Sequence, residues 1–209
     1  MPAQTNRSLV DGLVVLQTLC AAGGPVGVRD MARRLGWHPV RTNRLLQSLV
    51  LAGMARQDPE RRYLPGSGVH VLAAIATFGS GLLRRALPEL QRLAQETKAV
   101  VALGVLWQDE VCYLYHGGPD LPAGEALGRA VLHPVADSSI GQVLRDGLAE
   151  AVLRHGSADQ PHWSIAVPVG DPPHSGLACT AVPITTKPAS ILPRLRACAQ
   201  RIADLENAP

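Results

Sequence analysis

The sequence predicts an α+β protein of two domains, an N-terminal winged helix-turn-helix and a C-terminal antiparallel sheet flanked by helices. Three observations predict this architecture. Apolar residues recur at helical spacing up to Leu49, and a short basic hairpin follows them. After Ala99 the hydrophobic period changes to that of β-strands. A chain of 209 residues that is 46% hydrophobic can also bury a core in each of two small domains.

Three helices are expected to open the chain. Ser8 and Asp11 have the spacing of a capping box for a first helix. A second helix begins near Val28 and ends at Gly36, since glycine tolerates the left-handed backbone that helix ends often need. Pro39 then fits the first turn of a third helix. We expect the first helix to pack across the other two and complete a three-helix core.

The third helix has an apolar face and a basic face. Its basic face carries Arg, Asn, Gln and Ser and no acid, which suits phosphates and base edges in a major groove, although a solvated amphipathic helix is the alternative. Arg41 and Arg44 can each contact guanine through two hydrogen bonds, and Asn43 or Gln47 could read adenine. Arg44 could instead pair with an acid and fix the domain. The candidate DNA-binding residues, wing included, are Arg29, His38, Val40, Arg41, Thr42, Asn43, Arg44, Gln47, Arg56, Arg61 and Arg62.

A basic wing should follow the third helix. Residues 54–57 and 62–64 are predicted to be short strands, joined by a turn in which Pro59 takes a favoured position. The distribution of charge supports this interpretation. Residues 1–70 hold nine arginines, no lysine and four acids, a net charge of +5, whereas residues 71–209 carry −2. The basic excess thus lies with the helix pair, as the footprint of a DNA-binding surface would.

The second half should mix helices and strands. Two helices are predicted at 69–78 and 82–96, with the break between them at Gly79-Ser80-Gly81, and the first should connect the domains and offer an apolar face for a dimer contact. A hairpin should follow from Ala99, then a loop with a further strand near Ala126. The remaining predicted elements are a helix from about Ser139 with apolar positions as far as Leu153, strands at 163–169 and 176–184, and a final helix over 191–205. The expected domains are residues 1–65, a linker helix over 66–81, and residues 82–209.

A candidate small-molecule site lies around the start of the helix at Ser139. Free N–H groups and the helix dipole favour an anion at such a position. Ser164 and Thr180 lie in otherwise apolar strands and could donate hydrogen bonds to a ligand, with Cys179 as a neighbour. The ordinary alternatives are that Ser138 merely caps the helix and that Thr180 faces solvent. The candidate ligand-binding residues are Ser138, Ser139, Ile140, Gly141, Ser164, Cys179 and Thr180.

Several classes of function receive little support. The cysteines Cys20, Cys112, Cys179 and Cys198 are far apart and without zinc spacing, so we expect free, buried thiols in a reducing cytoplasm, with no metal and no cofactor. His155, His162 and His174 are too loosely spaced for a metal site and are expected to be scattered polar residues. An enzyme could use Cys112 with His116, but no acid is placed to orient the histidine. We also expect neither a signal peptide nor a membrane span.

Taken together, the chain resembles the IclR family of bacterial transcriptional regulators. RSLVDGLVVLQTL resembles the opening helix of the family, and VRDMARRLGWHPVRTNRLLQSLVLAGMARQDPERRYLPG resembles its helix-turn-helix and wing. Val40 and Arg41 replace the Ser-Thr pair that the family usually has ahead of the recognition-helix arginine, here Arg44. LPELQRLAQET, VALGVLWQDEVCYLY, HPVADSSIGQVL and SIAVPVGDPPHSGLACTAVP follow the effector-binding domain of the family in order.

The resemblance implies several properties of the protein. It implies a GAF/profilin-like second domain that holds a small organic effector, commonly a carboxylate or aromatic acid. It also implies a homodimer, often a dimer of dimers, that binds a palindromic operator. A regulator that needs no ligand is the main alternative. An open cleft with polar walls would favour the sensor, and a cavity filled by its own side chains would favour the alternative.

Overall fold

The computed structural model describes residues 5–80, 82–126 and 132–206. Its contacts divide the chain into two compact units, with the boundary in the sequence between Gly79 and Ser80. Each unit has a hydrophobic core of its own. Within the described residues, every helix is too short or too polar to span a bilayer.

The first unit has the predicted order of three helices and a hairpin. Its elements are α1 (Arg7–Ala21), α2 (Val28–Leu35), α3 (Pro39–Leu51), β1 (Ala55–Gln57), β2 (Tyr63–Pro65) and α4 (Ser67–Ser80). Gly36 ends α2 with a φ of 66°, as predicted. The start of α1 differs from the expectation. Asn6 caps the helix by accepting a hydrogen bond from the Leu9 N–H at 3.2 Å, so Ser8 and Asp11 form no capping box.

Tyr63 lies at the centre of the first core. Its side chain is buried against α1 and α3, with residues such as Val15 and Leu46. Its backbone N–H donates to the Val26 carbonyl at 2.8 Å and its carbonyl accepts from the Val26 N–H at 2.9 Å. Tyr63 therefore fastens the hairpin to the segment between α1 and α2.

The second unit is built on a six-stranded sheet in which all neighbours are antiparallel, in the order β5-β4-β3-β8-β7-β6. Its strands are β3 (Val100–Trp107), β4 (Glu110–Gly117), β5 (Leu132–Pro134), β6 (Ala151–His155), β7 (His162–Val169) and β8 (Ser175–Pro183). Its helices are α5 (Leu82–Thr97), α6 (Ala123–Ala126), the 3-10 turn η1 (Val135–Asp137), α7 (Ser139–Asp146) and α8 (Pro188–Glu206).

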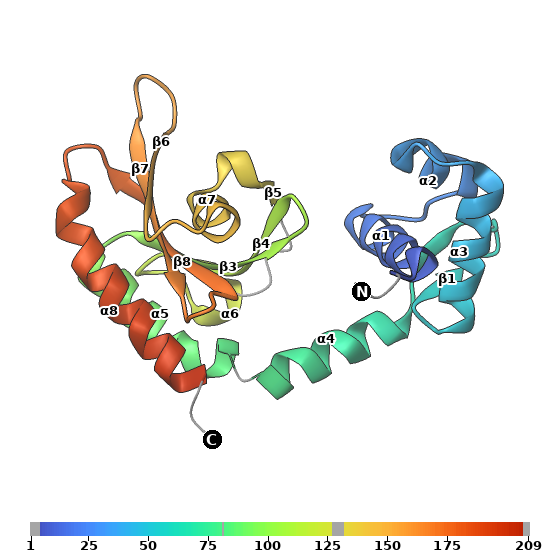
Figure 1. The fold of residues 1–209 in the computed structure, drawn as a ribbon, viewed down its shortest axis with the longest axis horizontal. Helices are drawn as coiled ribbons and strands as arrows, with labels where there is room; N and C mark the ends of the chain where they lie inside the picture. The colour runs from blue at the N-terminus through green and yellow to red at the C-terminus, as the bar shows by residue number, and fades with distance from the viewer. Residues whose placement is uncertain (1–4, 81, 127–131, 207–209) are drawn as a thin grey trace. The chain divides into compact units, whose positions relative to one another are not determined.

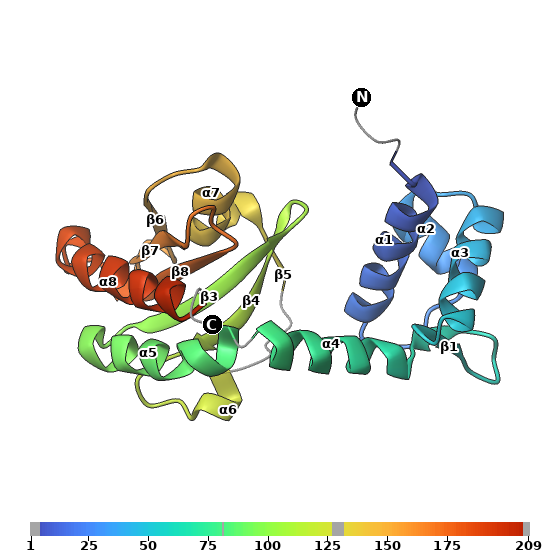
Figure 2. The same cartoon turned by 60° about the horizontal axis from the view of Figure 1, so that its bottom comes forward.

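The two faces of the sheet bury different helices. On one face, α5 and α8 lie side by side (Figures 1 and 2). Their buried residues pack in one cluster with Leu103 and Leu177 of the sheet. On the other face, α7 packs Ile140 and Val143 against small residues such as Ala178. Side chains in a strand point alternately to the two faces, so each strand serves both layers.

A β-bulge between β3 and β4 interrupts this alternation. Leu103 pairs with Tyr115 and Gly104 pairs with Tyr113, so Leu114 has no partner on β3. An extra residue of this kind shifts the side-chain alternation by one position. The rings of Tyr113 and His116 consequently lie on one face of the sheet, stacked with centroids 5.6 Å apart.

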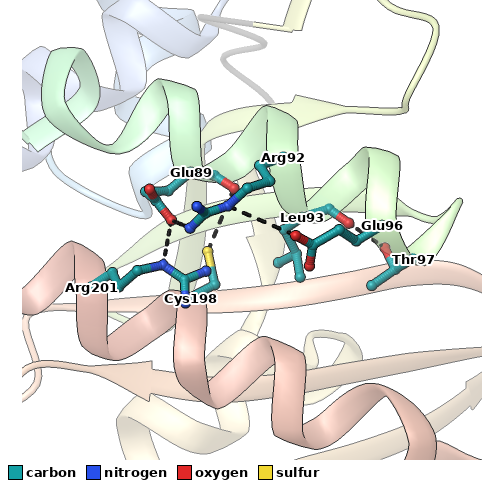
Figure 3. A network of polar contacts seen from close by, with 7 residues as sticks. All are labelled: Glu89, Arg92, Leu93, Glu96, Thr97, Cys198 and Arg201. Carbon is teal, nitrogen blue, oxygen red and sulfur yellow. Dashed lines mark hydrogen bonds and ion pairs between the residues drawn. The ribbon is translucent and has the colours of Figure 1, made fainter.

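A polar network ties α5 to α8 (Figure 3). The carboxylate of Glu89 accepts hydrogen bonds from Arg92 on its own helix and from Arg201 on α8, the latter at 2.5 Å. The thiol of Cys198 approaches the Glu89 carbonyl at 3.6 Å, and burial raises the pKa of this thiol to about 11. Glu89 therefore links the two helices through its hydrogen bond with Arg201.

Three predictions about the second half are wrong or incomplete. The segment near Ala126 is the short helix α6, not a strand. The helix that begins at Ser139, as predicted, ends at Asp146 because Gly147 adopts a left-handed φ of 65°. The apolar residues Val152 and Leu153 beyond it belong to the edge strand β6, which the sequence analysis missed.

The four cysteines are free thiols, as predicted. Cys179 and Cys198 are buried, and Cys112 is half-buried. The expectation of burial is wrong for Cys20, which is exposed near the end of α1, where the preceding residue Leu19 takes the core position.

Gly141 allows α7 to approach η1 closely. A Cβ atom at this position would lie 2.8 Å from both the Cα and the carbonyl oxygen of Val135, which are backbone atoms that cannot move aside alone. We expect Gly141→Ala to lower the free energy of unfolding by about 1–3 kcal/mol, measured by urea denaturation. The matched control is Gly124→Ala in α6, where a Cβ would meet nothing within 4 Å. Equal unfolding midpoints for both variants would contradict this packing.

Candidate nucleic-acid interface and ligand cleft

The third helix presents most of the predicted DNA-binding residues to solvent. His38 caps α3, its Nδ1 accepting from the Val40 N–H at 3.3 Å, and Pro39 occupies the first turn. Leu46 is buried in the three-helix core. The residues of the predicted set that are exposed at the start and on the outer face of α3 are His38, Val40, Arg41, Asn43, Arg44 and Gln47.

Thr42 does not belong to this exposed face. Its side chain is fully buried, and its hydroxyl donates to the His38 carbonyl at 3.2 Å. The prediction of Thr42 as a DNA-binding residue is therefore wrong for its side chain, because the helix turns this position into the core.

The Tyr63 hydroxyl forms hydrogen bonds with two amide side chains of α3. Its hydroxyl accepts a hydrogen bond from Gln47 Nε2 at 2.6 Å and donates to Asn43 Oδ1 at 3.2 Å. One end of each amide is thus fixed by the wing strand β2. Asn43 and Gln47 are presented in a defined orientation, which favours recognition because less side-chain freedom is lost on binding.

Arg41 is restrained by two residues of its own unit. Its guanidinium forms an ion pair with Asp11 of α1 and lies over the ring of Trp37, 4.6 Å from the centroid. The sequence left such a structural pairing open for Arg44, but it is Arg41 that pairs with an acid. A negative group and an aromatic face together hold the arginine at the junction of α1 and α3.

The acids of the first unit are all engaged by arginines. Asp30 pairs with Arg33 and Arg34, and Asp58 and Glu60 both pair with Arg62. The hydrogen bonds from Arg33 and Arg34 lower the pKa of Asp30. Within residues 5–80, five exposed arginines stand in no ion pair; they are Arg7, Arg29, Arg44, Arg56 and Arg61. Four of these five belong to the predicted DNA-binding set, and they carry the surplus positive charge of the unit.

The second unit has an open cleft of about 300 Å³ on the sheet face that also carries α7. Val100, Thr180 and Ala181 line it from the central strands β3 and β8. The pairing of β7 with β8 is irregular here, since Trp163 pairs with Val182 but Ile165 pairs with Cys179. Ala181 has a φ of 53° at this irregularity. The cleft therefore lies beside an interruption of the regular hydrogen-bond pairing between β7 and β8. Bulges of this kind are frequent next to functional sites.

Two of the predicted ligand-binding residues line this cleft. Ser164 and Thr180 both reach it, and the Thr180 hydroxyl donates to the Val100 carbonyl at 3.4 Å. Ser139, at the start of α7, is linked to the cleft because its hydroxyl lies 2.7 Å from the hydroxyl of Ser164. The start of α7 and the cleft are thus neighbours.

The other predicted ligand-binding residues have structural roles. Ser138 caps α7, accepting from the Gly141 N–H at 3.1 Å, which is the ordinary alternative that the sequence left open. Ile140 and Gly141 are buried between α7 and the sheet. Cys179 points to the opposite face, against α5 and α8, where burial raises its pKa to about 12. Strand alternation places Cys179 and Thr180 on different faces, so the two could not share a cleft.

Four histidines that the sequence analysis did not assign to any site line the cleft. They are His116 on β4, His133 on β5, His155 on β6 and His162 on β7. His155 and His162 are register partners with ring centroids 6.0 Å apart. Tyr113 stacks on His116 and, at 4.6 Å, on His133. The expectation of scattered histidines is wrong for His155 and His162. The described residues hold no group of three or more His, Cys, Asp or Glu side chains placed to bind a metal ion.

Cys112 and His116 cannot act as a nucleophile and its base. Neighbouring strand residues point to opposite faces, and Tyr113 shares a face with His116 because of the bulge at Leu114. Cys112 therefore lies on the other face. Burial also raises the pKa of its thiol, which disfavours the reactive thiolate.

Comparisons with known proteins agree with this architecture. Residues 8–59 match the model of the IclR helix-turn-helix domain. No curated protein matches the chain. Among solved structures, an IclR family transcriptional regulator from Brucella abortus is similar over 100% of this chain and 96% of its own, with a TM-score of 0.77 and 20% identity. A putative IclR regulator from Silicibacter sp. TM1040 is similar over 97% of both chains, with a TM-score of 0.75 and 18% identity.

A third similar structure contains a ligand. It is an IclR homologue from Microbacterium hydrocarbonoxydans complexed with 4-hydroxybenzoate, similar over 97% of this chain and 100% of its own. The TM-score is 0.66 and the identity is 19%. These structural likenesses establish that the fold runs through both units.

The pairing of Arg41 with Asp11 generates a testable prediction. Asp11→Asn removes the carboxylate that neutralises Arg41, so we expect tighter binding of random-sequence duplex DNA and a salt dependence that is steeper by about one unit of slope. Fluorescence anisotropy with a labelled duplex at several salt concentrations measures both. The matched control is Asp146→Asn, which breaks the exposed pair with Arg145 in the second unit. An unchanged affinity and slope in Asp11→Asn would show that the pairing does not restrain Arg41.

Proposed function

We propose that this protein is a ligand-responsive regulator of transcription, because residues 8–59 match the model of the IclR helix-turn-helix domain and the whole chain is similar in fold to IclR family regulators. It binds duplex DNA through the first unit and a small organic acid through the second. The observation that carries the DNA-binding part is the exposed face of α3, where Arg44 is uncompensated and two amides are held in fixed orientation.

The residues of the first unit divide into two roles. Arg44 and Asn43 on α3 read base edges, since arginine and asparagine make the commonest paired contacts to guanine and adenine. Arg29, Arg56 and Arg61 contact phosphates, which position the helix without reading sequence. Arg41 contacts a base edge or a phosphate once that group displaces Asp11 from its guanidinium.

The apolar residues of α4 support a homodimer that reads a palindromic operator. Val71, Leu72 and Ile75 are 55%, 53% and 63% exposed, which is unusual for three large apolar side chains of one helix. A second copy of the chain would cover them, and a two-fold dimer reads an inverted repeat. The operator and the four free thiols both favour a cytoplasmic protein.

The cleft supports a sensor rather than a ligand-independent regulator. It is open, and its walls carry hydroxyl, imidazole and phenol groups instead of being filled by side chains. The 4-hydroxybenzoate in the Microbacterium structure supports an acid as the ligand class. Such a ligand changes DNA affinity only if it binds one arrangement of the two units better than another, and α4 connects them.

Selection of bound duplexes from a randomised pool tests the proposal directly. We expect repeated rounds with the full chain to enrich an inverted repeat with half-sites about one helical turn apart, or a multiple of it. A pool that stays random after selection would contradict sequence-specific DNA binding.

Variants of α3 test the assignment of residues. We expect Arg44→Ala to weaken binding of the selected duplex about 10- to 100-fold and to relax preference at one base position, because one paired contact contributes about 1–3 kcal/mol. Arg41→Ala should also weaken binding and relax preference. Gel-shift assays with single-base variants of the duplex measure both effects. Arg145→Ala, an exposed arginine of the second unit, is the control and should bind as the parent does.

A further inference from the structure

Two pairs of imidazoles line the open cleft, one pair from the strands on each flank of the central strands β3 and β8. His116 and His133 lie on β4 and β5, and His155 and His162 lie on β6 and β7. The central strands β3 and β8 separate the two pairs in the sheet order. Four of the seven histidines of the chain therefore meet at one cleft although they are spread over 47 positions of sequence, from 116 to 162.

The charges that face the cleft are few. Its described lining residues include neither lysine nor arginine. The titratable groups that face it are the four imidazoles, the Tyr113 phenol on β4 and the Asp137 carboxylate of η1. Asp137 is exposed, and it is the one acid among these lining residues. Among the described side chains of the lining, the imidazoles are therefore the groups that can place a positive charge beside a bound acid.

Two of these imidazoles lie side by side on neighbouring strands. The stacked rings of His155 and His162, with centroids 6.0 Å apart, would repel one another if both carried a positive charge. A carboxylate between the two pairs removes this repulsion and accepts charge-assisted hydrogen bonds. The anion and the protons therefore stabilise one another in the cleft.

We propose that the cleft binds a carboxylate together with protons taken up by its histidines, so that ligand affinity rises as the pH falls through the range in which imidazole titrates. This inference rests on the proposed function of the second unit as the effector-binding unit. The sign follows from linkage, since a bound anion raises the pKa of an imidazole and the complex holds more protons than its parts. The regulator would then respond to an organic acid most strongly when the cytoplasm is acidified.

Isothermal titration calorimetry of the full chain with 4-hydroxybenzoate tests the proposal. Between pH 5.5 and 8, where the carboxylate of this probe stays ionised, we expect the affinity to fall about tenfold per pH unit for each proton taken up. Titrations at pH 6.5 in two buffers of different ionisation enthalpy should give an uptake of at least half a proton. The uncharged isostere 4-hydroxybenzamide should show neither effect.

Paired variants separate the cleft from the rest of the surface. His155→Gln with His162→Gln should abolish the pH dependence, whereas His174→Gln, an exposed histidine of the loop after β7, should leave it intact. If the double variant does not fold, the pKa values of the histidines are measured in the parent protein instead, by following the NMR signals of the imidazole C–H protons as a function of pH. The pKa values of at least two histidines should then rise when 4-hydroxybenzoate is added.

Several outcomes would overturn the inference. They are an affinity that does not change with pH, the absence of proton uptake, an unaltered pH dependence in the double variant, or no binding of millimolar 4-hydroxybenzoate at pH 5.5. Selection of an inverted repeat from random duplexes needs no ligand. That experiment can therefore succeed while the proton-coupled site fails, and the two failures are distinguishable.

Discussion

The pairing of β3 with β8 is the constraint on which the second unit depends. These strands are the middle of the sheet and bring residues 100–104 beside residues 176–180. The strands between them in sequence extend the sheet outward, β4 and β5 to one side and β7 and β6 to the other. The helices α5 and α8 then share one face, while α7 and the cleft share the other. A shift of one residue between β3 and β8 would exchange the two faces and destroy both layers.

In the first unit, a small number of acids decides which arginines are available. Asp11, Asp30, Asp58 and Glu60 restrain arginines through ion pairs, and the other arginines of residues 5–80 are exposed and stand in no ion pair. Tyr63 restrains the amides between them. A surface whose charges and hydrogen-bonding groups are already oriented loses less freedom when it binds a rigid partner such as a duplex. The same interactions that stabilise the unit thus prepare its recognition face.

Sequence reasoning succeeded where a local pattern has one structural outcome. Apolar spacing gave α1, α2, α3 and α8, and Gly36 marked the end of α2. It failed where tertiary context decides. The apolar spacing as far as Leu153 predicts a helix. Val152 is nevertheless in a strand, because residues 151–155 pair with β7, and the local pattern does not reveal this pairing. Thr42 and Cys179 were assigned to sites although helix rotation and strand alternation turn them into cores. The histidines of the cleft come from four strands, and only the register brings them together.

The unpaired residue at position 114 has a consequence for comparing homologous chains. A relative could lack this residue and still direct each flanking side chain to the same layer, since the extra residue is accommodated outside the ladder. An alignment of relatives should therefore place any single-residue gap of this strand at position 114. A gap placed several positions away would assign every intervening residue to the wrong side, and ligand specificity would then be inferred from residues that never touch a ligand.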